Sequence, residues 1–197
     1  MMKLILGQRQ FGLNKLGIIN MYTVGIEHEF YILDSSNYEL VNLAEMEMQK
    51  IFGLNVKSEA FCCQIEINTP VCENIGQLEI HYQRILDHIH HQALTHGLLI
   101  LKSSTPIQGF DFKNLSLFVS ERHNFLQKTY REVYNFFICC SLQIHVKTQA
   151  LDRRYPLVNY LRPYLPIFLA LSNSSPFWQG ELSGLQSFRA QILQAIP

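Results

Sequence analysis

The sequence has no apolar run that approaches the roughly 20 residues needed to cross a bilayer. Its most apolar stretch, residues 161–171, is interrupted by Pro163 and Pro166. The first twenty residues contain only the short apolar run 4–6, which is too little for a secretory signal peptide. We therefore expect a soluble, cytoplasmic protein that does not act on membranes.

Charge is also scarce. Sixteen basic and sixteen acidic residues cancel, and the absence of a basic cluster argues against a nucleic acid as partner. Charged residues make up 16% of the chain, against about 25% in an average domain, while 48% are hydrophobic. An independent domain needs charged residues to cover its surface. This low content therefore suggests that the chain binds a partner, forms an oligomer or lacks part of its length.

Cysteine spacing excludes the common zinc and redox motifs. The five cysteines form two adjacent pairs and one single residue, with no C-x-x-C spacing, which favours a reduced, cytoplasmic setting. With 197 residues, the chain is long enough for one sizeable domain. We expect residues 1–20 to be a loose N-terminal extension and residues 21–197 to form that domain.

Three predicted strands carry polar side chains at every second position. Because side chains alternate between the faces of a strand, the polar residues of each strand share one face. On the third strand, Leu142, Ile144 and Val146 are expected to face the core. The polar positions are Glu27 and Glu29 in residues 24–33, Gln64, Glu66 and Asn68 in residues 61–68, and Gln143 and His145 in residues 136–148.

These polar faces converge if the three strands share a sheet. Neighbouring carboxylates repel each other, so they usually hold a cation or a proton between them. The alternative is an acidic face in contact with solvent, which is ordinary in antiparallel sheets. Three carboxylates and a histidine favour Mg²⁺ or Mn²⁺ over structural zinc, and such ions can bridge the phosphates of a nucleotide.

Helices are predicted between the strands. Apolar residues recur at intervals of three and four over residues 74–96, and Gly97 stands where a helix C-cap glycine belongs. Two further helices are expected over residues 121–135 and 155–171, the second kinked by its two prolines. Residues 98–101 are predicted to be a short buried strand.

Three segments carry a more specific signal. Gly25 to Phe30 reads Gly-Ile-Glu-His-Glu-Phe, and Lys57 to Cys72 contains two spaced glutamates. The longest, residues 161–189, contains Ser-Pro-Phe-Trp-Gln-Gly and closes with Ser-Phe-Arg. Together they resemble the type 2 glutamate-cysteine ligase family, also called carboxylate-amine ligases. The resemblance runs from about residue 23 to the last residue and covers only the N-terminal half of a family member.

The resemblance implies a fold and an activity. The fold is α+β, similar to the catalytic domain of glutamine synthetase, with a mainly antiparallel curved sheet and helices packed on one face, here truncated. The activity is an ATP-dependent ligation in glutathione biosynthesis, in which the γ-carboxylate of glutamate becomes an acyl phosphate that cysteine or another amine attacks. ATP and Mg²⁺, or Mn²⁺, are the implied cofactors.

The resemblance also assigns roles to individual residues. A catalytic role falls to Arg189, as the partner of a phosphate or a substrate carboxylate. Lys147, which stands in place of a family glycine, is a second catalytic candidate, because its point charge can bind phosphate. The cofactor contacts are His145 and Arg189. The implied metal ligands are Glu27, Glu29, Glu59, Glu66 and His145.

Departures from the family pattern keep two other functions open. Where the family strand reads Gly-x-His-Val-His-Val-Gly, this chain has Ser141, Gln143 and Lys147 in place of its first glycine, first histidine and last glycine. The second half of a family member, with a further metal-binding glutamate, is not matched. We therefore expect a homo-oligomer or a complementing C-terminal half. The alternatives are a non-catalytic remnant or interaction module, and a metal-dependent hydrolase.

Overall fold

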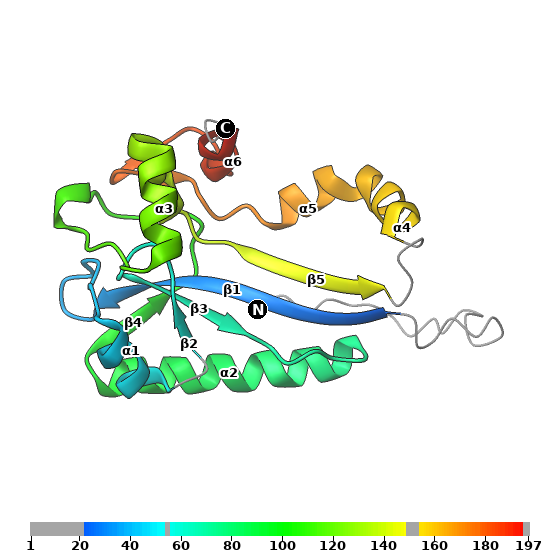
Figure 1. Cartoon of the computed structure of the whole chain (residues 1–197), viewed down its shortest axis with the longest axis horizontal. Coiled ribbons are helices and arrows are strands. Elements are labelled where there is room, and N and C mark those ends of the chain that lie inside the picture. The colour runs from blue at the N-terminus through cyan, green and yellow to red at the C-terminus, as the bar shows by residue number, and fades with distance from the viewer. Residues whose placement is uncertain (1–21, 54–55, 149–153, 195–197) are drawn as a thin grey trace.

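The computed structural model describes residues 22–53, 56–148 and 154–194 (Figure 1). The extension expected over residues 1–20 lies outside this part. Five antiparallel strands form the main sheet, in the order β2-β3-β1-β4, and β5 pairs with the N-terminal half of β1, beyond the end of β4. The predicted α+β class with an antiparallel sheet is confirmed. The strands are β1 (Tyr22–Asp34), β2 (Val56–Ser58), β3 (Gln64–Asn68), β4 (Leu98–Leu101) and β5 (Leu142–Thr148).

The register of the sheet brings the three polar strand faces together. Glu29 lies opposite Glu66, while Glu27 lies opposite Asn68 on one side and Gln143 on the other. Residues directly opposite each other in an antiparallel pair share a face of the sheet. The predicted convergence of the polar strands is therefore confirmed, with β1 as the central strand.

Two helices, α1 (Glu45–Phe52) and α2 (Ile75–Thr95), pack against the opposite, apolar face (Figure 1). The helix predicted over residues 74–96 is confirmed, and it ends before Gly97, whose φ of 68° suits glycine. The buried residues of this core include Phe30, Ile32, Ile65 and Ile67 from the strands and Phe52, Leu86 and Ile89 from the helices.

Helix α2 begins at an N-cap that can be tested by substitution. The Asn74 side chain accepts a hydrogen bond from the Gln77 N–H at 2.9 Å. We expect Asn74→Ala to lower the free energy of unfolding by about 1 kcal/mol, as loss of such a cap usually does. Urea denaturation measures the change, and Asn74→Ser, which keeps a capping oxygen, is the control. Equal losses in the two variants would contradict a capping role.

A second core lies on the polar side of the sheet, beyond the acidic residues. Tyr31 of β1 and the 3-10 helix η3 (Arg131–Ile138) contribute to it, and Trp178 packs edge-on against Phe110 at its border. The remaining elements are η2 (Phe112–Asn114), α3 (Glu121–Tyr130), α4 (Arg154–Leu161), η5 (Arg162–Tyr164), α5 (Leu165–Leu171), β6 (Phe177–Trp178), β7 (Glu181–Leu182) and α6 (Phe188–Gln194).

Two expectations about the later part of the chain are wrong. Leu142, Ile144 and Val146 do not face the core: they are 53%, 65% and 40% exposed, because the core under α1 and α2 includes no residue of β5. The helix expected over residues 121–135 ends at Tyr130, since Arg131 has a φ of 50° and the chain continues as η3.

The expected break near the prolines is confirmed. Pro163 lies in the 3-10 turn η5, which separates α4 from α5. Within the described residues, none of the helices combines the length and the apolar character that a bilayer span requires.

Candidate metal centre

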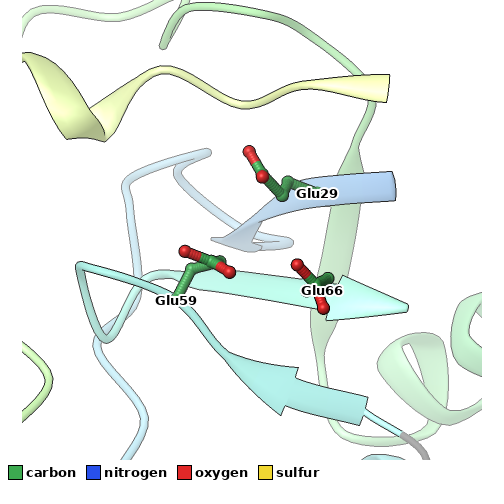
Figure 2. Close-up of side chains that lie close together, drawn as sticks. All are labelled: Glu29, Glu59 and Glu66. Atoms are coloured by element: carbon green, nitrogen blue, oxygen red, sulfur yellow. The ribbon is translucent and has the colours of Figure 1, made fainter. Parts of the chain in front are cut away.

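Three glutamates from different segments converge on the polar face of the sheet (Figure 2). Glu29 comes from β1 and Glu66 from β3, while Glu59 lies in the connection between β2 and β3. One carboxylate oxygen of each lies within 4.8 Å of those of the other two. We call these residues the carboxylate trio. In the described part of the chain, no other group of three acidic, histidine or cysteine side chains is this close.

Neighbouring polar groups orient two members of the trio. Ser141 donates two hydrogen bonds to Glu29, from its backbone N–H at 2.8 Å and from its hydroxyl at 2.9 Å. The Asn68 amide donates to Glu66 at 2.5 Å, and the Lys57 Nζ lies 3.5 Å from the same carboxylate. Such contacts fix the direction in which the carboxylate oxygens point.

The electrostatics of the trio favour a bound proton or cation. Burial, and to a lesser extent the charges of Glu29 and Glu66, raise the pKa of Glu59 to about 8. Burial also raises the pKa of Glu29, although the hydrogen bonds from Ser141 and the charge of Arg189 oppose this. Near neutral pH the metal-free site therefore retains a proton, which a divalent cation would displace.

The chemistry of the trio fits a hard divalent cation. All three potential ligands are carboxylate oxygens, which Mg²⁺ and Mn²⁺ prefer, whereas a structural zinc site uses thiolate or imidazole ligands. Mg²⁺ takes six ligands and usually keeps several waters, so three protein oxygens leave positions open for substrate phosphates.

Two of the predicted ligands form a separate pair beside the trio. The Nε2 atom of His145 lies 3.2 Å from a carboxylate oxygen of Glu27, and both side chains are partly exposed. His145 is opposite Gly25 in the sheet, two positions from Glu27 on β1. The structure thus divides the five predicted ligands into the trio and this pair.

Arg189 is in α6, at the edge of the site. It is close enough that its charge lowers the pKa of Glu29, and its Nε atom is buried without a hydrogen-bond partner. A buried donor without a partner is costly, so this guanidinium is suited to an anionic ligand.

Lys147 is the one predicted site residue that lies far from the trio. It is exposed and opposite Thr23, six residues along β5 from Ser141. At about 3.3 Å per residue, this places its backbone roughly 20 Å along the strand from the trio.

Sequence reasoning did not find the contacts that orient the trio. The sequence drew attention to Ser141 only because it replaces a family glycine. It drew attention to Lys57 only because a segment that resembles the family begins there. Ser141 is in phase with Gln143 and His145, so the period of two already placed it on the polar face. Lys57 carries no such signal, because its contact depends on its register opposite Glu66.

Comparison with known proteins gives the site its context. The family model described as Glutamate-cysteine ligase family 2 (GCS2) matches residues 23–197. A protein of Jannaschia sp. (strain CCS1) named "Putative glutamate--cysteine ligase 2" is 30% identical over 180 residues, which are 89% of this chain and 47% of that protein. A protein of the same name from Ruegeria pomeroyi is 31% identical over 180 residues, 89% of this chain and 46% of its own.

A solved structure shares the fold. The crystal structure of a bifunctional glutathione synthetase from Pasteurella multocida matches 84% of this chain and 25% of its own, with a TM-score of 0.61 and 15% identity. The chain spans about half the length of the curated relatives it matches. On the match over residues 23–197, this chain belongs to family 2 of the glutamate-cysteine ligases.

Proposed function

We propose that the chain acts as an ATP-dependent carboxylate-amine ligase that joins glutamate to cysteine or a related amine, with Mg²⁺ or Mn²⁺ as cofactor. The observation that carries the proposal is the carboxylate trio, held on the sheet of a chain that belongs to this family. Its five cysteines are all unpaired, which suits the reducing cytoplasm, where we place the activity.

In this proposal Glu29, Glu59 and Glu66 hold the cation. Once bound, the metal would neutralise and align the phosphates of ATP during phosphoryl transfer. Glu59 would give up its proton to solvent to serve as a ligand of the cation. Through its two hydrogen bonds, Ser141 favours the ionised form of Glu29 and points its carboxylate into the site.

Other residues of this chain would position the reacting groups. A carboxylate oxygen of glutamate attacks the γ-phosphorus of ATP and ADP leaves; the amine nitrogen then attacks the acyl carbon and phosphate leaves. The guanidinium of Arg189 offers planar donors to a phosphate or a carboxylate. Glu27 orients His145 toward the same face, as a further metal ligand or a phosphate contact.

Release of ADP in the presence of glutamate, cysteine, ATP and Mg²⁺ tests the proposal. We expect release to require both amino acids, and Glu29→Gln to lower it at least about 100-fold, in line with loss of groups that align and stabilise the transferring phosphoryl group. Glu79→Gln, on the exposed surface of α2, is the matched control and should leave the rate unchanged.

The same assay addresses the alternatives. A well-folded chain that releases no ADP would support a non-catalytic interaction module, which the exposed apolar residues of β5 favour. Metal-dependent hydrolysis without ATP would support a hydrolase and contradict the ligase.

A further inference from the structure

Two buried polar residues lie next to the carboxylate trio on the polar face of the sheet. Tyr31 is opposite Gln64 in the register, and this pair lies two residues along the strands from the pair of Glu29 and Glu66. Both side chains are almost completely buried, with exposed fractions of 0% and 1%. A buried polar group is costly unless it is hydrogen-bonded, so each of them needs partners in the surrounding segments.

Both side chains bind the same backbone carbonyl. The Tyr31 hydroxyl donates to the Ile138 carbonyl at 2.6 Å, and the Gln64 amide donates to it at 2.8 Å. The Tyr31 hydroxyl also accepts a hydrogen bond from the Cys140 N–H at 3.3 Å. A carbonyl oxygen has two lone pairs, and here it has two donors. The segment from Ile138 to Cys140 is therefore fixed against the sheet directly before Ser141.

The position of this segment determines where Ser141 meets Glu29. Ser141 follows Cys140 in the chain and donates its N–H and its hydroxyl to the Glu29 carboxylate, at 2.8 and 2.9 Å. Two hydrogen bonds to one carboxylate persist only where the donor residue keeps its position relative to β1. Tyr31 is two residues from Glu29 on that strand and is paired on both sides, so its hydroxyl positions Ser141 from a rigid element.

The other end of the Gln64 amide binds the segment that carries Glu59. Its side-chain oxygen accepts a hydrogen bond from the Phe61 N–H at 3.2 Å. Phe61 is two residues after Glu59, in the connection between β2 and β3, and its ring is buried in the second core. One amide thus joins the connection that carries Glu59 (Figure 2) to the segment that precedes Ser141.

We propose that Tyr31 and Gln64 are positioning residues of the metal centre, which keep the donor Ser141 and the ligand Glu59 in place without being ligands themselves. The three carboxylates repel one another, so their approach within 4.8 Å must be maintained by groups outside the trio. An apolar pair of similar size would fill the same space but would direct neither segment. The effect on metal binding rests on the proposed function of the trio, whereas the contacts that position Ser141 do not.

Amide hydrogen exchange in the metal-free chain tests the positioning of Ser141. We expect Tyr31→Phe to speed exchange of the Ser141 N–H about 10-fold relative to that of Ile89 in α2, in line with loss of one buried hydrogen bond. Tyr82→Phe is the matched control, because it removes a hydroxyl that lies 2.6 Å from Nδ1 of His28, on the opposite face of β1. It should leave this ratio unchanged. An unchanged ratio in Tyr31→Phe would overturn the proposal.

Binding of Mn²⁺ tests the consequence for the metal centre. By calorimetric titration at pH 6.5, we expect Tyr31→Phe to lower Mn²⁺ affinity about 10-fold, the lower end of the effect of losing a group that orients a ligand. Gln64→Met, which keeps the length of the side chain, should lower it further because it also releases the segment of Glu59. Tyr82→Phe should bind Mn²⁺ as the wild type does, even where it unfolds more easily. Wild-type affinity in Tyr31→Phe and Gln64→Met would overturn the proposal.

A double variant tests whether Tyr31 acts through Ser141. If it does, the chain with both Tyr31→Phe and Ser141→Ala should lose less than about 100-fold in Mn²⁺ affinity, the product of two independent losses of about 10-fold. A loss equal to the full product would overturn this route. A wild type that binds Mn²⁺ but releases no ADP would contradict the proposed function alone. An active wild type whose exchange ratio is unchanged by Tyr31→Phe would contradict the positioning alone.

Discussion

The Glu59→Gln variant is expected to resist urea better than the wild type at pH 8.5, and to differ little from it at pH 5. Burial, with the charges of Glu29 and Glu66, raises the pKa of Glu59 to about 8 in the folded protein, against about 4.3 for glutamate in an unfolded chain. As the pH rises between these values, the unfolded state loses its proton first, so the wild type loses stability. We expect a gain of about 3 kcal/mol, less than the full shift implies, because the buried amide keeps part of the desolvation cost.

Urea denaturation at pH 5, 7 and 8.5 measures this difference. Glu79→Gln, at an exposed position on α2, controls for the removal of one negative charge. Mg²⁺ should reverse the order of stability at pH 8.5, since it binds the intact trio and stabilises the folded state by mass action. If wild type and Glu59→Gln lose stability with pH at the same rate, Glu59 is not the group that titrates.

The polar face of the sheet could be predicted because it follows from a local rule. Alternation along one strand places Glu27 with Glu29, and alternation along another selects Glu66, whatever the rest of the chain does. The helix that ends before Gly97 could be predicted for the same reason. Its apolar repeat and its C-cap glycine are both given by residues that are close together in the sequence. These features need no knowledge of which strands are neighbours.

The remaining features depend on tertiary neighbours. Glu59 belongs to a connection without any periodicity, so only the family resemblance marked it. The exposure of Ile144 depends on where α2 lies under the sheet, which the alternation within β5 does not reveal. The separation of Glu27 and His145 from the trio follows from the register of β5 on β1. A strand pattern fixes the face of a residue, but not its partner.

Substitutions at Glu29 and Ser141 are expected to weaken metal binding in two distinguishable ways. Glu29→Gln removes a charged ligand and should lower the affinity for Mn²⁺ at least about 100-fold at any pH. Ser141→Ala removes one of the two hydrogen bonds that oppose the raised pKa of Glu29. That pKa should therefore rise further, and Mn²⁺ must compete with a more tightly held proton.

For Ser141→Ala we expect a loss of about 10-fold in Mn²⁺ affinity at pH 6.5, within the usual effect of an outer-shell partner. The loss should shrink as the pH rises to 8.5, because a higher pH favours the ionised form of Glu29 in either protein. Calorimetric titration with Mn²⁺ at the two pH values separates the variants, with Ser36→Ala, in an exposed turn, as the control. A loss for Ser141→Ala that is equal at both pH values would show that its hydroxyl does not act through the ionisation of Glu29.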